Sequence, residues 1–427
     1  MGETTLKPIA DGVSLCAVQT DRFKTCKIVM YMALPLEGDI AAAAVLPYIL
    51  RRSCRKYPDF TALNGHLDML YGAVLGASVA KKGEAQILHL SISAIDDRFA
   101  IDGGGTAREA AQLLLDLLFD PKLENGTFAA SEVETEKRLL LERMRSEDDD
   151  KRTYALRRCQ EVMCGGEAFG RNRYGTAEEI ESLTSARVYA AWRRVLEQAV
   201  IRVVMVSSGT DEAVRQTLIS QFGGMKRNVQ PITTRFLPAP EGDVKTVRET
   251  QPLKQGTLVL GLRCGMRDCD DMDPTMLVMN DMFGGGVYSK LFTVVREKMS
   301  LCYYCRSLFN RDKGILLIPA GIETDNQEKT TDAVLAQLAE MQNGTFTREL
   351  FEMSVRAMTD SIREYTDLPD ALCSYYGSQI FRDSVKTTDE RIAEIRAVKF
   401  EDLQHAAQQI RLDTIFMLAG TGAENDA

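Results

Sequence analysis

The sequence contains an internal repeat, which limits the possible folds more than any other feature. The tetrapeptide Asn-Gly-Thr-Phe occurs at 125–128 and again at 343–346, each time before a long charged stretch. Segments 183–188 and 398–403 each open a helical pattern that leads into an apolar stretch. Leu-Tyr-Gly at 70–72, with its Lys-Gly turn at 82–83, corresponds to Cys-Tyr-Tyr at 302–304 with Lys-Gly at 313–314. Because these parallels keep the same order, they indicate two copies of one unit of about 200 residues.

The pattern within each copy predicts an α+β fold. We expect two homologous domains, each with an antiparallel-rich sheet covered by helices on one side. The first domain is predicted at 1–222 and the second at 249–427. The glycines and prolines of 223–248 are typical of a linker.

Local signals place the elements of the first copy. Asp39 is expected to cap a helix through the alanine-rich run, and Ser131 with Glu134 forms a capping box for a long helix reaching about residue 146. The remaining predicted strands lie at 13–19, 23–34, 73–80, 86–95 and 201–206, and the remaining helices at 60–70, 107–118, 151–163 and 185–196.

Composition excludes several classes of protein. The net charge of -9 argues against broad nucleic-acid binding. The most apolar window, 41–50, is too short to span a membrane, and the start of the chain has no signal-peptide core, so we expect a cytoplasmic protein. Most of the ten cysteines are expected to be buried and free. Cys302 and Cys305 lie in a strand-like run, where residues three apart point to opposite faces, which disfavours a shared metal or redox site, even with Cys264 and Cys269 nearby.

The stretch 281–304 carries the candidate chemistry of the second copy. The glycines Gly284, Gly285 and Gly286 allow a tight turn or a close backbone approach. Ser289 is predicted to cap a helix that holds Arg296 near its end. Tyr303 follows seven residues later and enters an apolar, aromatic run. This pattern predicts a glycine loop, a helix, and an arginine and a tyrosine available for binding.

This order of parts, with the run Gly-Gly-Gly-x-x-Ser-Lys-Leu-Phe-x-x-x-Arg-Glu-Lys at 284–298, resembles the inverzincin metallopeptidases, pitrilysin and the mitochondrial processing peptidases. The resemblance covers essentially the whole chain and implies that the two domains form half of a clamshell chamber. Segments 46–52 and 63–72 are similar to a bacterial branch associated with elongation factor P modification, which is encoded as paired proteins.

Active members of this family carry H-x-x-E-H on an early helix, where two histidines bind zinc and the glutamate activates water. The corresponding positions here are 44–48, so Ala44 and Tyr48 replace the histidines and Pro47 replaces the base. The later helix offers Glu136 and Glu142, with Arg143 after them. The three histidines, at 66, 89 and 405, do not have metal-ligand spacing. We therefore expect no zinc in this chain and no catalytic residue in its first domain, so the chain should be inactive alone as a metallopeptidase.

In the family, the second-domain arginine and tyrosine bind the substrate backbone near the scissile bond. The resemblance gives this role to Arg296 and Tyr303, with Gly284, Gly285 and Gly286 as further substrate-binding residues. If the register slips by one residue, Tyr304 takes the place of Tyr303. The alternative is structural: Arg296 pairs with an acidic neighbour and Tyr303 fills the hairpin.

Two functions are compatible with this sequence. In the first, the chain is the zinc-less subunit of a two-chain metallopeptidase, and a homologous partner carrying H-x-x-E-H supplies the zinc. In the second, it is a peptide- or protein-binding scaffold that kept the fold without a proteolytic role. Neither requires nucleic acid or a membrane, and a homodimer is the alternative assembly when the partner is absent.

Overall fold

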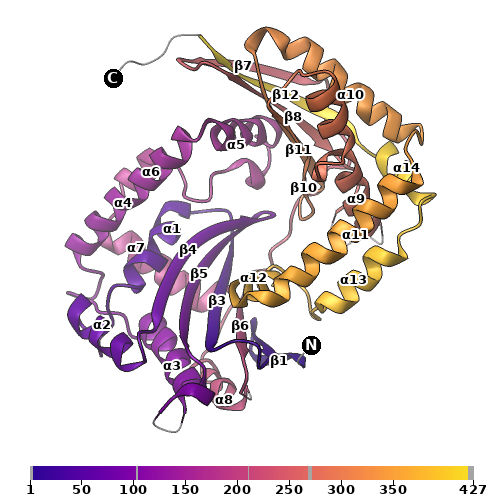
Figure 1. Ribbon diagram of the computed structural model, residues 1–427. Coiled ribbons are helices and arrows are strands. Elements are labelled where there is room, and N and C mark those ends of the chain that lie inside the picture. The colour runs from indigo at the N-terminus through magenta and orange to yellow at the C-terminus, as the bar shows by residue number, and fades with distance from the viewer. Residues whose placement is uncertain (1–2, 102–103, 210, 268–271, 422–427) are drawn as a thin grey trace. The chain divides into compact units, whose positions relative to one another are not determined.

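The computed structural model describes residues 3–101, 104–209, 211–267 and 272–421, and it contains two sheets with helices (Figure 1). Cys269 lies outside the described residues. Two compact units divide the chain. The first comprises residues 1–144, 172–233 and 363–387, and the second comprises 145–171, 234–362 and 388–427. Thus each unit takes one segment from the other half of the chain.

The sheet of the first unit has the strand order β1-β2-β6-β3-β5-β4. Only β2 and β6 run parallel; the other neighbours are antiparallel. Its longest pairing joins β3 and β5 from Thr25 opposite Ile95 to Pro35 opposite Ala85. The strands are β1 (Thr4–Ala10), β2 (Val13–Gln19), β3 (Thr25–Pro35), β4 (Val74–Lys82), β5 (Ala85–Ile95) and β6 (Val200–Ser207).

One face of this sheet packs on most of the helices of the first half in a single large core. These helices are α1 (Ile40–Leu50), α2 (Phe60–Met69), α3 (Thr106–Phe119), α4 (Ala130–Asp149), α6 (Ala177–Glu181), α7 (Ser185–Gln198) and α8 (Glu212–Phe222). The other face is covered by α12 (Pro369–Gly377), where Leu372, Cys373 and Tyr376 are buried against β2, β3 and β6. The sheet is therefore buried on both faces.

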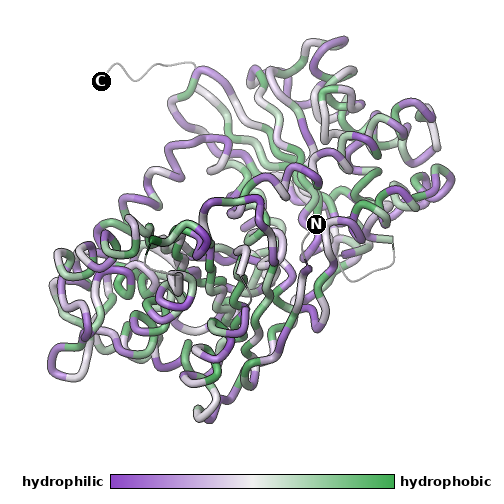
Figure 2. Tube along the Cα trace, turned by 60° about the horizontal axis from the view of Figure 1, so that its bottom comes forward, coloured by the Kyte–Doolittle hydropathy of each residue, from purple (hydrophilic) through white to green (hydrophobic). Residues whose placement is uncertain are grey.

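The sheet of the second unit has the order β10-β11-β8-β12-β7, and β9 also pairs with β11. Its strands are β7 (Lys245–Gln251), β8 (Gly256–Arg263), β9 (Tyr304–Cys305), β10 (Leu308–Asn310), β11 (Ile315–Ile322) and β12 (Arg411–Gly420). Its main core involves α9 (Asp273–Asn280), α10 (Gln327–Gln342), α11 (Arg348–Glu364), α13 (Thr388–Ala397) and α14 (Asp402–Gln408). Figure 2 shows hydrophobic segments running along the strands.

The opposite face of the second sheet carries α5 (Lys151–Met163), a helix from the first half of the sequence. Buried charges hold this segment in place. Glu167, just after α5, lies 2.8 Å from Arg263 Nη2 and also pairs with Lys313, and Arg263 Nε lies 3.0 Å from Asp413. All four side chains are at most 4% exposed. Short 3₁₀ helices lie at η1 (Asp97–Phe99), η2 (Ala168–Gly170), η5 (Thr324–Asn326) and η6 (Tyr365–Asp367), and π-helical segments lie at η3 (Asp281–Gly285) and η4 (Leu291–Lys298).

The predicted α+β class with two antiparallel-rich sheets is confirmed, but helices cover both faces of each sheet and not one side, because α12 and α5 pack on the second faces. The capping box is wrong, because α4 begins at Ala130 and Ser131 already lies inside the helix. The amides of Glu132 and Val133 bond to the Ala129 carbonyl, and Glu134 pairs with Lys137. Strand β1 was not predicted. Within the described residues, no helix is long and apolar enough to cross a membrane.

Candidate functional site

Helix α1 carries the residues at the expected zinc motif. Asp39 caps it as predicted, since its carboxylate accepts a hydrogen bond from the Ala42 amide at 3.1 Å. Every residue from Ile40 to Leu50 is buried, including Ala44, Pro47 and Tyr48. The alanine-rich run is therefore a core helix that continues through its internal proline.

Arginine side chains contact the residues at the positions that correspond to the zinc site. The Arg143 guanidinium lies 4.2 Å from the centre of the Tyr48 ring, a cation–π contact. Arg52 Nη1 lies 2.8 Å from Glu136 Oε1, and the Glu136 side chain is buried. Burial, followed by the neighbouring Tyr174, raises the pKa of Tyr48 to about 12, so the phenol stays protonated at neutral pH.

These side chains do not fit a zinc ion. Zinc needs nitrogen, thiolate or carboxylate ligands. Here the first position is a methyl group, the second is a neutral phenol beside a cation, and the carboxylate of Glu136 is already neutralised by Arg52. Among the described residues, no group of three or more His, Cys, Asp and Glu is placed to hold a metal.

Arg296 and Tyr303 lie together in the second unit. Arg296 is near the end of the π-helical segment η4, which Leu291 and Val295 anchor in the core. Its Nε donates a hydrogen bond of 2.9 Å to the Tyr303 carbonyl, and its Nη1 lies 3.1 Å from Glu297. The guanidinium also stacks 4.4 Å from the centre of the Phe292 ring. Thus the structure joins the two predicted residues directly.

Tyr303 presents its side chain to solvent and is 56% exposed. Its backbone amide donates to the Gly321 carbonyl, which fixes the residue beside β11. Its hydroxyl donates to Glu323 Oε1 at 3.0 Å. This hydrogen bond raises the pKa of Tyr303, so the hydroxyl keeps its proton and remains a donor.

Both residues line one pocket of about 390 Å³, together with Cys302, Glu323 and Asn326 among others. Glu323 was not predicted, because twenty residues separate it from Tyr303 and no motif marks it. Tyr304, the substitute for Tyr303, instead faces Arg152, whose guanidinium lies 4.8 Å from its ring centre. Tyr304 is not among the residues lining this pocket.

The three glycines allow close backbone approach, and they do not line this pocket. The Gly284 carbonyl accepts a hydrogen bond from the Ser307 amide, and a Cβ at Gly284 would lie 2.6 Å from that nitrogen. A Cβ at Gly285 would meet the Asp281 carboxylate, and one at Gly286 would meet the Tyr288 ring. The close contacts of these three glycines therefore pack the backbone around η3.

One expectation about this region is wrong. Within the described chain, Ser289 makes no side-chain cap to η4, and its buried hydroxyl has no partner. Cys302 and Cys305 are both buried, and the strand begins only at Tyr304, so strand alternation does not extend to Cys302.

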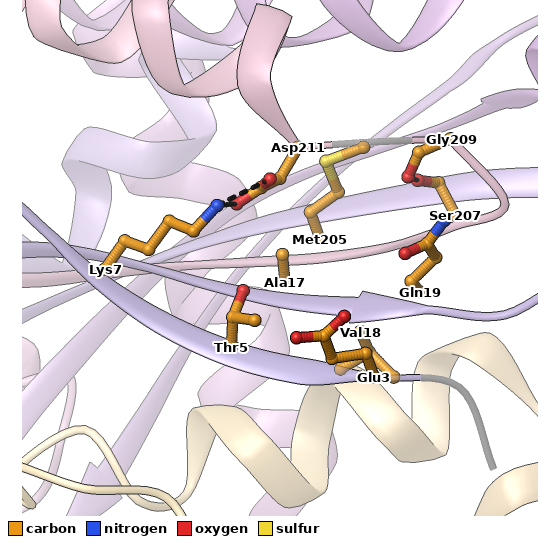
Figure 3. A pocket seen from close by; sticks show the side chains of 10 residues that line it. All are labelled: Glu3, Thr5, Lys7, Ala17, Val18, Gln19, Met205, Ser207, Gly209 and Asp211. Atoms are coloured by element: carbon orange, nitrogen blue, oxygen red, sulfur yellow. Dashed lines mark hydrogen bonds and ion pairs between the residues drawn. The ribbon is translucent and has the colours of Figure 1, made fainter.

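A different pocket, of about 280 Å³, lies over β1, β2 and β6 in the first unit (Figure 3). Two of its charged groups, Lys7 and Asp211, neutralise each other, since Lys7 Nζ lies 2.8 Å from Asp211 Oδ2, and Glu3 adds a further carboxylate. None of the predicted site residues lines it. The pocket around Arg296 and Tyr303 is therefore the better candidate for substrate binding.

Known proteins resemble this chain along its length. Residues 182–358 match the family model described as the peptidase M16 inactive domain. A probable inactive metalloprotease of Bacillus subtilis, YmfF, is 28% identical over 97% of this chain and 98% of its own length. An uncharacterized zinc protease of the same organism, YmxG, is 24% identical over 71% of this chain and 73% of its own length.

Solved structures agree. A conserved protein from Enterococcus faecalis has a TM-score of 0.88 and 25% identity, covering 99% of this chain and 100% of that one. A peptidase M16 inactive domain from Pseudomonas fluorescens shares the fold, with a TM-score of 0.79, 16% identity and the same coverage of the two chains. The chain is therefore M16 peptidase-like: it shares the fold of these proteins along its length and is similar to members described as inactive.

Proposed function

We propose that this chain is the zinc-less subunit of a two-chain metallopeptidase, in which a homologous partner carrying H-x-x-E-H supplies the zinc. One observation carries the proposal: Arg296 and Tyr303 share a pocket at the surface, while the residues at the ancestral zinc position cannot bind metal. The arginine and tyrosine of the second unit would act on a peptide bond only where another chain provides the metal.

The geometry supports a role in binding the peptide backbone. Nε and Nη1 of Arg296 are engaged by Tyr303 and Glu297, and among the described residues Nη2 has no protein partner. We propose that Nη2 donates to a substrate carbonyl. To donate to the oxyanion that develops during hydrolysis, the Tyr303 hydroxyl would turn its one proton from Glu323 to the substrate. This subunit would thus position the substrate and stabilise negative charge.

The test reconstitutes the chain with a homologous H-x-x-E-H subunit and measures cleavage of a fluorogenic peptide. Removing one oxyanion donor costs about 10²–10³ in kcat, so we expect a loss of that order for Tyr303→Phe and for Arg296→Ala. Arg306→Ala and Tyr365→Phe alter exposed side chains outside the pocket and serve as matched controls. Unchanged cleavage by both site variants in a pair that still assembles would refute the proposal.

The scaffold function predicts a different result. The pair would assemble and bind peptide without cleaving it, and Arg296→Ala would weaken peptide binding alone.

The similarity of segments 46–52 and 63–72 extends the proposal to elongation factor P modification. Deleting the gene should then change the mass of elongation factor P, and an unchanged mass would separate this chain from that process.

A further inference from the structure

Glu323 contributes a carboxylate to the pocket that holds Arg296 and Tyr303. It directly follows β11, whose residues are all buried, and its carbonyl accepts a hydrogen bond of 2.9 Å from the Asn326 amide. The backbone of Glu323 is therefore held at the end of a core strand. Its side chain is exposed and makes no cap to η5, the short helix that begins after it. The local fold thus positions this carboxylate without using it.

The charges of this pocket do not balance. Two carboxylates, of Glu297 and Glu323, and one guanidinium, of Arg296, line it, so it has one net negative charge. Nη1 of Arg296 lies 3.1 Å from Glu297 and neutralises that carboxylate. Within the described part of the chain, Glu323 has no ion-pair partner, and its side chain is bonded only by the Tyr303 hydroxyl at 3.0 Å. The uncompensated charge therefore lies on Glu323.

We propose that this pocket selects a basic side chain of the substrate, a lysine or an arginine, which pairs with Glu323. That the ligand is a peptide rests on the proposed function. Complementary charge favours a cation at this position and disfavours an acidic side chain, so the selection works in both directions. The volume of about 390 Å³ lies within the range of small-ligand sites, about 300–1,000 Å³, and leaves space for a long side chain.

The same contact links recognition to the Tyr303 hydroxyl. In the free pocket, the one proton of that hydroxyl points at Glu323. A bound ammonium or guanidinium gives Glu323 other hydrogen-bond donors, so the Tyr303 proton can turn to the substrate. Glu323 is thus a specificity-determining residue that also positions the Tyr303 proton. A basic substrate should therefore gain in kcat as well as in binding.

The first test measures peptide binding to the isolated full chain by calorimetry, without a partner subunit. The peptides share one neutral sequence with blocked ends and differ at one position, which is lysine, glutamine or glutamate and is moved along the peptide. We expect the lysine peptide to bind about 1.5–5-fold more tightly than the glutamine peptide, the range of an exposed ion pair, and the glutamate peptide to bind most weakly. Equal binding at every position, or no binding of any peptide, would overturn the proposal.

Substitutions at Glu323 assign the preference to this pocket. Glu323→Gln should abolish it, and Glu323→Lys should reverse it in favour of the glutamate peptide. Asp325→Asn is the matched control, because it removes an exposed carboxylate two residues away that does not line the pocket. A lysine preference that survives Glu323→Gln, or that Asp325→Asn removes equally, would show that general surface charge attracts the peptide.

Cleavage by the reconstituted pair separates recognition from the proposed function. Tyr303→Phe keeps the charge of Glu323, so the isolated chain should still prefer the lysine peptide, while the kcat advantage of that peptide should disappear. If the pair cleaves no peptide but binding still depends on Glu323, the proposed function fails and the recognition site stands. An unchanged kcat advantage in Tyr303→Phe would show that Glu323 does not control the Tyr303 proton.

Discussion

Replacing Glu167 by glutamine should destabilise the second unit severely. Glu167 contacts Arg263 and Lys313, whose side chains are 2% and 0% exposed. The substitution removes the negative charge that faces both buried cations. Breaking a buried pair by removing one partner costs about 3–5 kcal/mol. At roughly 2–4 °C per kcal/mol for a unit of this size, Tm should fall by about 6–20 °C.

Calorimetry gives the change in Tm, and hydrogen exchange locates it. We expect faster exchange in β8 and β12 and little change in the first unit. Glu241→Gln is the control, because Glu241 pairs with Arg235 where both side chains are about half exposed or more, and exposed pairs contribute about 0–1 kcal/mol. If Glu167→Gln costs no more than Glu241→Gln, the buried network does not hold α5 in place.

The stability difference between the natural chain and the Glu167→Gln variant should also depend on pH. Burial opposes ionisation of Glu167, but hydrogen bonds from Arg263 and Lys313 outweigh it and lower the pKa of the carboxyl in the folded state. A lowered folded pKa means that the stabilisation is present above the unfolded value of about 4.3 and is lost as the pH falls below it. The natural chain and Glu167→Gln should therefore converge in Tm between about pH 4 and pH 2. A constant difference across that range would contradict the assigned ionisation.

Other predictions concern the two sites. Metal analysis of the isolated chain should find no stoichiometric zinc, and one zinc lost on Glu136→Ala would refute our interpretation of the first unit. Arg143→Ala should lower the free energy of unfolding in urea by about 0.5–2 kcal/mol, because it removes the cation–π contact. Tyr48→Ala should lower it by roughly 3–5 kcal/mol, because it also leaves a cavity in the core. Gly284→Ala should destabilise the protein by about 1–3 kcal/mol, because the added Cβ meets the Ser307 amide. Gly65→Ala is the control: its Cβ would have no atom within 4 Å, so it should be neutral or slightly stabilising. Equal effects of the two substitutions would contradict the close packing at Gly284.

Much of the fold was predictable because its signals are local. Asp39 before an apolar run marks a helix start, and the structure shows that cap. The pairing of β4 with β5 follows from two β-rich runs around Gly83, which adopts a left-handed conformation. Ser131 failed as a signal because a serine near a helix start fits both the cap and the first turn, and only backbone geometry separates them.

The candidate site was predictable only in part. Arg296 and Tyr303 stand in a recognisable run, but their direct hydrogen bond depends on the bend at Tyr303. The contacts Tyr48–Arg143 and Arg52–Glu136 join α1 and its C-terminal flank to α4. The spacing of residues in the sequence does not predict such contacts, because they depend on how the helices pack.

Each unit contains a segment from the other half of the sequence, and this constrains when each unit can finish folding during synthesis. The first sheet is covered on its second face by residues 363–387, so its fold is complete only after most of the chain has left the ribosome. A nascent chain of 222 residues would expose the apolar surface that α12 later buries, including Val29 and Val204. Separate expression of the two halves should therefore yield chaperone-bound or aggregated protein, and mixing them during refolding should restore solubility. Each half of the chain thus holds a segment that completes the unit built mainly from the other half.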